Sequence, residues 1–578
     1  MGRSLPLDKT TCAREKAEPV ARSQQNTQWR RVAHGLGLLV VLLVYGLIVS
    51  HRAIDVEYTQ AFTEAPLLLY VFLLLVSPLR DDFRSSLAAA LPIVWIYALH
   101  DEYYLQFGRV PNFADFALLA DLRVALSPAL QVLAALCVAL PVVTWFRMLD
   151  ARRLLRRSLW LLAAPACVAI GCVLAAPSQV YKALDKVTID EEWSDGLTAD
   201  HWGRVYSALL REVRRRSFAR GVESFTPLTA SKLPLSAELL AAIDGRNVHL
   251  IVLESFIDLR LLTQVRFSEP PLAPSFTRWL DPFISSSVSP VFGGETARAE
   301  FEVLCGVPSL RAYGLEFLAF TGAPTYCLPQ ILKNAGYHTV LTFPHGPLFF
   351  NTRRAYPGLG FEERIFGDMY TEPGQESVLQ NGEPYLNDAE LFPQNLAKVR
   401  RLLAARRPFL NYVLTIYGHW TFAVDPHGHP PHLELSVKDE DLRKIGVTMH
   451  QRTDALASYL TALRELDPTG IIMLVADHLP PLPRGTRDYE RYGYKGRGLL
   501  PPGAADFRFF ENFLLVFVDG QPRKLPLMRH FDLPHWLLNE LTHGAYCKEK
   551  RCDFGTLPFD PKSYLDAYHT LLGLASRN

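Results

Sequence analysis

Residues 293–301 read Gly-Gly-Glu-Thr-Ala-Arg-Ala-Glu-Phe, and the rest of the chain is organised around this stretch. Two glycines and an acid lead into a threonine, and a helix-forming run follows as far as Leu304. The pattern predicts that Thr296 lies at a helix start, where unpaired N–H groups and the helix dipole favour an anionic phosphate. Because threonine at such a position is more commonly only an N-cap, this stretch alone does not decide the function.

The composition predicts two halves of different character. The 578 residues suffice for more than one domain, and the net charge of +1 gives no overall basic field for binding nucleic acid. Hydrophobic residues make up 49% of the chain and the mean hydropathy is +0.07, which is high for a wholly soluble protein. The apolar residues concentrate before residue 177, so we expect a membrane half followed by a polar half.

The first half contains five apolar segments, and all but the third reach the ~20 residues that a helix needs to cross hydrocarbon. The segments are Val32–Ser50, Ala61–Leu79, Ser85–Leu99, Ala125–Phe146 and Leu159–Ala176. We therefore expect a cytoplasmic tail over residues 1–31 and a transmembrane domain with five helices over residues 32–177. The alternative is a set of buried helices in a soluble core.

Arginine is concentrated before the first segment and between the fourth and fifth, whereas residues 51–60 and 100–124 are poorer in it. The positive-inside rule then places the N-terminus in the cytoplasm and everything after Pro177 outside. Residues 178–240 mix Trp202 and Tyr206 with several arginines, which predicts an interfacial helical connector lying on the membrane. An ordinary surface helix packed on the next domain is the alternative.

Four cysteines lie in the expected outer part, and an even number in an oxidising compartment predicts two disulfides. Cys547 and Cys552 would close a tight loop, which leaves Cys305 and Cys327 for the second pair. Four free thiols are the alternative. A zinc cluster is disfavoured because the chain has no C-x-x-C pair.

Polar side chains follow several apolar, strand-like runs of the second half. The runs at 247–256, 337–344, 408–416 and 470–476 end near Glu254, His345, His419 and the Asp477-His478 pair. Strands that alternate with helices predict a doubly wound α/β domain over residues 241–578, whose site lies at the C-terminal ends of the strands. Carboxylates and histidines suit Zn²⁺ or Mn²⁺ with a position left for a substrate oxygen, although each residue alone could be an ordinary capping or loop residue.

Five motifs together are similar to the lipoteichoic acid synthase branch of the sulfatase (alkaline phosphatase) superfamily, which includes phosphoglycerol transferases. They are V-L-E-S-F at 252–256, G-G-E-T-A-R-A-E-F at 293–301, F-P-H-G at 343–346, Y-V-L-T-I-Y-G-H at 412–419 and V-A-D-H at 475–478. The resemblance implies five membrane helices followed by an α/β sulfatase-like (alkaline phosphatase-like) extracytoplasmic domain. It also implies a bacterial cytoplasmic (inner) membrane, with that domain on the periplasmic or extracellular side.

The resemblance assigns roles to particular residues. It makes Thr296 the nucleophile and implies one divalent ion, Mn²⁺ or Zn²⁺ with Mg²⁺ also admissible, held by Glu254, Thr296, Asp477 and His478. It places His419 at the substrate headgroup, gives the phosphate contact to Arg354 or to Arg353, and adds His345 as a further substrate-binding candidate. Leu479-Pro480-Pro481 departs from the family pattern, so the headgroup or acceptor can differ.

The implied function is transfer of a phosphoglycerol-type headgroup from a phospholipid donor to an envelope glycan or glycolipid acceptor, through a phospho-threonine intermediate. A phosphoethanolamine transferase and a hydrolase are the rival enzymes. A non-catalytic envelope-assembly module is the rival from another class of protein. The formylglycine motif of true sulfatases has the wrong spacing around Cys305, which is expected to be structural.

Overall fold

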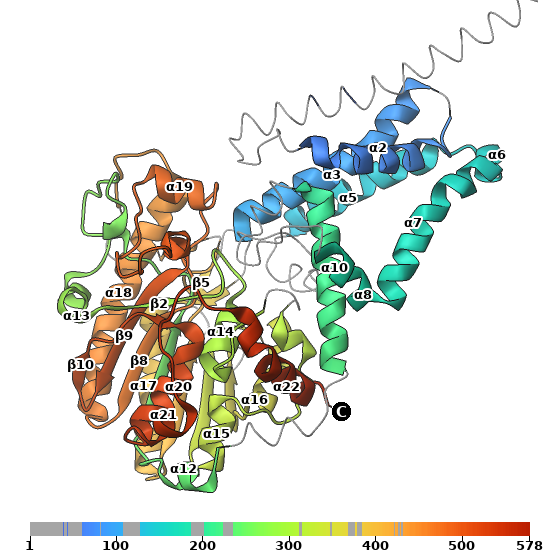
Figure 1. Cartoon of the computed structure of the whole chain (residues 1–578). Coiled ribbons are helices and arrows are strands. Elements are labelled where there is room, and N and C mark those ends of the chain that lie inside the picture. The colour runs from blue at the N-terminus through green and yellow to red at the C-terminus, as the bar shows by residue number, and fades with distance from the viewer. Residues whose placement is uncertain are drawn as a thin grey trace, which may run out of the picture. The chain divides into compact units, whose positions relative to one another are not determined.

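The computed structural model describes residues 61–107 except 81, 128–185, 202–223, 235–310, 315–346, 349–367, 376–378, 384–425 except 421, and 432–577, together with residues 39, 43 and 428. The chain divides into two compact units. The second, here called the outer unit, has Leu210–Asn578 as its largest segment. The division falls within one long helix, α10 (Arg204–Glu223) (Figure 1). The domain boundaries given above stay predictions.

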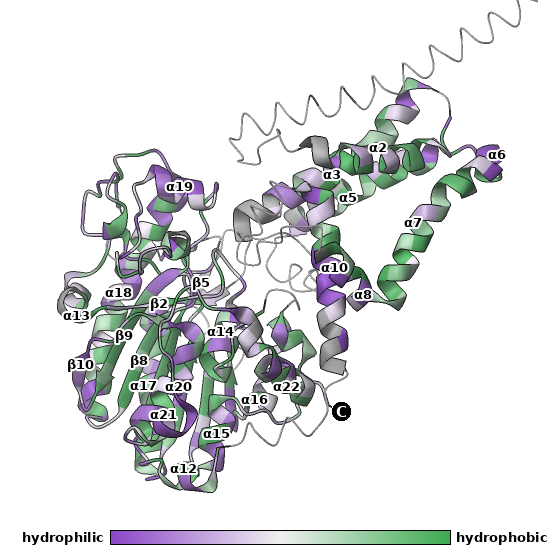
Figure 2. Ribbon diagram, in the orientation of Figure 1, coloured by the Kyte–Doolittle hydropathy of each residue, from purple (hydrophilic) through white to green (hydrophobic). Residues whose placement is uncertain are grey.

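The described part of the first unit consists mostly of helices. They are α2 (Ala61–Val76), α3 (Phe83–Phe107), α5 (Pro128–Arg147), α6 (Ala151–Leu154), α7 (Arg157–Ala175) and α8 (Pro177–Asp185), and the four longest, α2, α3, α5 and α7, are apolar. Figure 2 shows α7 coloured as hydrophobic along most of its length, and it has no buried residue. Within the described residues, α7 is the one helix long and apolar enough to cross a membrane, with a mean hydropathy of 2.1. The first predicted span lies outside the described residues except for Leu39 and Leu43, and the five-helix topology stays a prediction.

Buried polar residues join α2, α3 and the start of α10 within this first unit. The carboxylate of Glu64 accepts the backbone N–H groups of Arg204 and Val205 at 3.1 and 2.5 Å, so a side chain of α2 caps α10. The guanidinium of Arg204 donates to both carboxylate oxygens of Asp101, at 2.5 and 2.9 Å. Tyr97 donates to Glu64 at 2.5 Å, and every one of these side chains is at least 95% buried.

A nine-stranded mixed sheet forms the centre of the outer unit. The strand order is β11-β2-β9-β8-β1-β7-β3-β4, with β10 beside β9. The strands are β1 (Val248–Leu253), β2 (Ser285–Val288), β3 (His338–Phe343), β4 (Glu363–Phe366), β7 (Phe409–Leu414), β8 (Ile471–Ala476), β9 (Glu511–Val518), β10 (Gln521–Arg523) and β11 (Met528–Arg529). A separate hairpin pairs β5 (Glu376–Val378) with β6 (Pro384–Leu386).

Helices cover both faces of the sheet, because alternate residues of the buried strands point to opposite sides. On β1, Leu250 and Val252 pack in one core with helices α14 and α20, whereas Ile251 and Leu253 pack in a second core with α17 and α18. These helices are α14 (Thr296–Cys305), α17 (Asp388–Ala404), α18 (Glu440–Leu466) and α20 (Leu533–Leu541). The remaining helices are α12 (Ala237–Ala241), α13 (Pro274–Phe283), α15 (Leu328–Asn334), α16 (Thr352–Leu359), α19 (Thr486–Arg491), α21 (Ala545–Lys550) and α22 (Leu565–Ala575) (Figure 1).

The α/β prediction is therefore confirmed, with one difference in the sheet. Strands β8, β1, β7, β3 and β4 run parallel as a doubly wound domain requires, but β9 runs antiparallel to β8 and to β2. The sequence Ser285-Ser286-Ser287-Val288 of β2 gave no strand signal, because its buried residues are mostly serines rather than apolar side chains.

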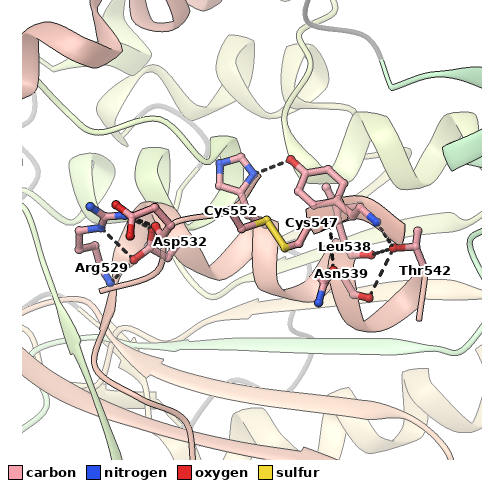
Figure 3. The surroundings of a disulfide bond; sticks show 10 residues. Arg529, Asp532, Leu538, Asn539, Thr542, Cys547 and Cys552 are labelled. Atoms are coloured by element: carbon pink, nitrogen blue, oxygen red, sulfur yellow. Dashed lines mark hydrogen bonds and ion pairs between the residues drawn. A yellow bond between two sulfur atoms is a disulfide. The ribbon is translucent and has the colours of Figure 1, made fainter. Parts of the chain in front are cut away.

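Two disulfides link the four predicted cysteines, Cys305 with Cys327 and Cys547 with Cys552. The first ties the last residue of α14 to the residue before α15. The second closes α21 near the Arg529–Asp532 ion pair and the hydrogen bond from Thr542 to Leu538 (Figure 3). The apolar helix α7 and these disulfides together indicate a membrane-anchored chain with an extracytoplasmic outer domain.

Candidate active site

The strand register brings two carboxylates together at one edge of the sheet. Leu253 of β1 pairs with Ala476 of β8, so Glu254 and Asp477 follow neighbouring parallel strands at the same level. Both side chains are buried, with 2% and 0% of their surface exposed. The first residue of α14 lies against them, and the hydroxyl of Thr296 is 2.9 Å from Glu254 Oε2 and 2.9 Å from Asp477 Oδ2.

The backbone before α14 accounts for the position of that hydroxyl. Gly293 has φ of 70°, and Glu295 has φ of 64°, a left-handed conformation that is uncommon for a residue with a side chain. An ion pair of 3.1 Å between Glu295 and Arg298 holds this turn against α14. The turn sets Thr296 as the first residue of the helix, with its hydroxyl at the helix N-terminus.

The hydroxyl of Thr296 lies within hydrogen-bonding distance of more acceptors than it has protons. This hydroxyl carries one proton and can donate it to only one of the two carboxylates. Burial and the neighbouring charge of Glu254 raise the pKa of Asp477 well above its ordinary value. Burial also works against ionisation of Glu254, but nearby His419 and His478 hold its pKa below the ordinary value. Two ionised carboxylates at this separation require a compensating positive charge.

The fourth member of the cluster is an imidazole oriented by the backbone. Nδ1 of His478 lies 2.9 Å from the carbonyl oxygen of Leu479, so Nδ1 carries the proton and Nε2 presents a lone pair. Nε2 lies 3.3 Å from Asp477 Oδ2 and 3.8 Å from Glu254 Oε1. Burial lowers the pKa of His478, which favours the neutral ring.

These donors fit a divalent metal ion. One ligand atom each of Glu254, Asp477 and His478 lies within 4.8 Å of the other two, and all three residues are buried. Two carboxylates, a neutral imidazole with a fixed tautomer and an adjacent hydroxyl form a mixed oxygen and nitrogen donor set. A divalent cation would supply the missing positive charge, so the residues present fit the ion that the sequence analysis predicts.

A buried arginine braces the strand end that carries Glu254. Arg452 of α18 donates to the backbone oxygen of Glu254 at 2.7 Å and to Thr415 Oγ1 at 3.1 Å. Its guanidinium also pairs with Asp388 at 2.8 Å, and both charged side chains are buried. A Cβ added to Gly418 would lie 2.1 Å from Arg452 Nη1, so a residue with a side chain would clash with this guanidinium.

The predicted substrate residues divide into two groups. His345 and His419 both lie beside the ring of Tyr385 from β6, with ring centroids 5.9 and 5.8 Å apart. Both histidines interact electrostatically with Glu254: His419 lowers the pKa of Glu254, and the charge of Glu254 raises the pKa of His345, against the larger effect of burial. Burial lowers the pKa of His345 to about 4, so this ring is neutral at physiological pH.

Arg353 and Arg354 are both exposed on α16. Within the described part of the chain, neither makes a hydrogen bond or ion pair to the carboxylate cluster. Their role as phosphate ligands stays a prediction, and no recorded contact chooses between them.

A second carboxylate network lies one helical turn below Thr296. Glu300 of α14 accepts hydrogen bonds from Tyr412 of β7 at 2.6 Å and from Tyr356 of α16 at 3.1 Å. Burial raises the pKa of Glu300 to about 8. Sequence reasoning missed this residue, although its spacing of four from Thr296 places both on one face of a helix. It also missed Tyr385 and Arg452, for which the chain carries no local signal.

The sulfatase family model matches residues 246–539, just over half of the chain. A putative cyclic β-1,2-glucan modification protein of Rhizobium meliloti is 26% identical over 41% of this chain and 36% of its own length. A lipoteichoic acid synthase of Staphylococcus saprophyticus is 25% identical over 32% of this chain and 28% of its own length. The chain thus spans about a third of the length of these two relatives.

Among solved structures, the phosphoglycerol transferase GacH of Streptococcus pyogenes in complex with sn-glycerol-1-phosphate is 17% identical. The match covers 63% of this chain and 92% of GacH, with a TM-score of 0.42. The family match includes the four clustered residues and the parallel strands that carry three of them. The chain therefore belongs to the sulfatase family.

Proposed function

We propose that this protein is a membrane-anchored, metal-dependent transferase that moves a phosphoglycerol-type headgroup from a phospholipid to an envelope glycan or glycolipid. The observation that carries the proposal is the hydroxyl of Thr296, held 2.9 Å from each of two buried carboxylates at a helix N-terminus. Of the two relatives that match, one is named for modifying a cyclic glucan and the other for synthesis of lipoteichoic acid.

A divalent ion bound by Glu254, Thr296, Asp477 and His478 would stabilise the threonine alkoxide and the charge on the phosphoryl oxygens. The residues of the chain perform the remaining chemistry. The hydroxyl proton of Thr296 leaves to an adjacent carboxylate, and Oγ forms a bond to the donor phosphorus. The bond from phosphorus to the diacylglycerol oxygen breaks, and that oxygen takes a proton from protonated His419.

The second half of the reaction reverses these roles. Nδ1 of His419 lies 2.6 Å from the carbonyl oxygen of Trp420, so in the neutral ring Nδ1 carries the proton and Nε2 accepts. Nε2 takes the proton of an acceptor hydroxyl, whose oxygen bonds to phosphorus as the bond to Thr296 Oγ breaks and Oγ recovers its proton from the carboxylate. The N–H groups at the start of α14 orient the phosphoryl oxygens in both halves.

The test is mass spectrometry of the peptide that contains Thr296, after the full chain has been loaded with Mn²⁺ and mixed with phosphatidylglycerol. We expect the mass of one glycerophosphoryl group on Thr296, and no such mass on the Thr296→Ala variant. Parallel incubation with phosphatidylethanolamine tests the rival headgroup. An unmodified Thr296 in a protein that releases diacylglycerol would exclude the covalent mechanism, and turnover without any glycan would identify a hydrolase.

A further inference from the structure

Trp420 differs from the other tryptophans in the described part of the outer unit. Its side chain is 41% exposed, and its ring makes no aromatic, cation–π or hydrogen-bonding contact with the described residues. Trp279, by contrast, lies against Arg464 at 4.5 Å and packs edge-on against Phe517 at 5.5 Å. Trp536 is buried in the core. Trp420 therefore leaves a large flat apolar surface open to solvent.

The backbone that carries this exposed ring is held next to the site. Trp420 directly follows His419, and its backbone oxygen accepts the Nδ1–H group of that histidine at 2.6 Å. The hydrogen bond that sets the tautomer of His419 thus also fixes the backbone of Trp420. The hydroxyl of Tyr417, three residues before Trp420, donates to Gln451 at 2.9 Å and accepts from the backbone N–H of Asp425 at 2.8 Å. Polar contacts therefore hold the chain on both sides of Trp420.

We propose that Trp420 is a stacking platform for a sugar ring of the acceptor glycan, an inference that rests on the proposed transferase function. One face of a pyranose presents C–H groups that pack on an indole, while its hydroxyls stay at the rim and remain hydrated. The negative face of the aromatic ring favours these polarised C–H groups. A sugar stacked here would present its hydroxyls next to His419, the residue to which the mechanism assigns removal of the acceptor proton.

The surroundings favour a sugar over a membrane surface as the occupant. Binding to lipid requires several apolar side chains on one face, together with basic residues for anionic headgroups. Among the described residues of the outer unit, the exposed large hydrophobic side chains are Trp420 and Leu499. Along the chain Trp420 lies between Tyr417 and Asp425, which hydrogen-bond to each other. A single exposed indole, rather than a group of exposed apolar side chains, suits a carbohydrate.

The experiment compares Trp420→Ala, Trp420→Phe and Leu499→Ala in the full-length protein, with phosphatidylglycerol as donor and a β-1,2-linked gluco-oligosaccharide as acceptor. Leu499 is the matched control because it is 40% exposed. For Trp420→Ala we expect the KM for the oligosaccharide to rise about tenfold, equivalent to about 1.4 kcal/mol. The initial release of diacylglycerol should persist in this variant. Trp420→Phe should retain most of the affinity, and Leu499→Ala should leave the KM unchanged.

Direct binding of the same oligosaccharide to the Thr296→Ala variant separates this inference from the proposed function. If Thr296 never forms a phosphoryl adduct but binding still depends on Trp420, the transfer mechanism fails and the platform stands. An acceptor KM unchanged by Trp420→Ala would overturn the platform. A loss of donor cleavage together with weaker binding to phosphatidylglycerol vesicles would overturn it too, because that result assigns Trp420 to the membrane.

Discussion

Two clusters of buried charged residues, one in each unit, differ in how completely their charges are paired. In the first unit, Glu64 accepts a tyrosine hydroxyl and backbone N–H groups, while Asp101 faces the fork of Arg204. In the outer unit, Glu254 and Asp477 share one threonine hydroxyl. Their other oxygens accept hydrogen bonds from Ser255 and from the backbone of His478, so their donors are hydroxyl and backbone N–H groups. The first cluster includes the positive charge of Arg204, whereas among the described residues that hydrogen-bond to the carboxylates of Glu254 and Asp477 there is no arginine or lysine side chain.

This difference separates a structural cluster from a functional one. A buried ion pair with matched donors holds elements together, and here it fixes the start of α10 to α2 and α3. A buried cluster with too many acceptors is destabilised unless it binds a cation, and that requirement is typical of a metal site. Composition alone does not distinguish them, because both clusters combine carboxylates with one basic or titratable side chain.

The largest expected effect comes from removing one carboxylate of the unbalanced cluster. Asp477→Asn should lower transfer activity about 1,000-fold or more, which corresponds to about 4 kcal/mol of transition-state stabilisation. The same change should leave the metal-free protein at least as stable as the metal-free wild type, because one of two facing carboxylates is gone. Activity assays and thermal unfolding with and without chelator measure both effects.

Asp454→Asn, on the exposed side of α18, is the matched control and should change neither quantity. Chelator should lower the unfolding temperature of the wild type and of this control, but should have little effect on Asp477→Asn. An Asp477→Asn protein that still gains stability from Mn²⁺ or Zn²⁺ as the wild type does would contradict the assignment of this residue as a ligand.

In the first unit, by contrast, removing one charge of the Arg204–Asp101 pair should lower stability. Arg204→Met leaves Asp101 buried without its partner, which should destabilise the start of α10 by about 3–5 kcal/mol. Hydrogen exchange of the α10 amides measures this loss, and metal binding by the outer unit should not change. Arg220→Met, at an exposed position of α10, is the control.

A double variant sharpens the same comparison. Asp101→Leu combined with Arg204→Met removes both charges together, so it should recover most of the stability that Arg204→Met loses. If the single and double variants are equally destabilised, the ion pair is not what holds the helix.

How far the sequence predicts these clusters depends on whether the signal is local. The ends of β1 and β8 could be found because each strand is a continuous apolar run that stops at a carboxylate. Thr296 could be found because two glycines and an acid lead into it and a helix-forming run follows, which marks the start of a helix. The four residues that meet at the site lie on three segments, and the parallel strand order is the rule that joins them.

Contacts that depend on tertiary packing could not be predicted in this way. Arg452 lies among the charged residues of a long helix, and only the fold reveals that it is buried against the backbone of Glu254. The antiparallel course of β9 follows from its partners β2 and β8, and an apolar run gives no strand direction. Glu64 and Arg204 are 140 positions apart, so no local pattern links them.

The smallest effect, counted per pH unit, is expected for Glu300, whose side chain accepts hydrogen bonds from two buried tyrosines and, within the described residues, has no ion pair. Burial raises its pKa from 4.5 to about 8, so at neutral pH the folded protein keeps it protonated while the unfolded chain ionises it. Its stabilising contribution is therefore complete below pH 4.5 and is lost as the pH rises towards 8. Within that window the free energy of unfolding should fall by about 1.4 kcal/mol per pH unit on account of this residue.

Glu300→Gln removes the titrating proton and keeps an oxygen that can accept from Tyr412. Unfolding of wild type and variant, measured at intervals between pH 5 and pH 8, gives the contribution of Glu300 as the difference between the two slopes. Other buried acids, such as Glu302, titrate in both proteins and cancel in this difference. Parallel pH profiles for the two proteins would mean that Glu300 is ionised in the folded state. In that case the site below Thr296 carries a third buried negative charge, and the positive charge needed there is larger than the cluster of Glu254 and Asp477 implies.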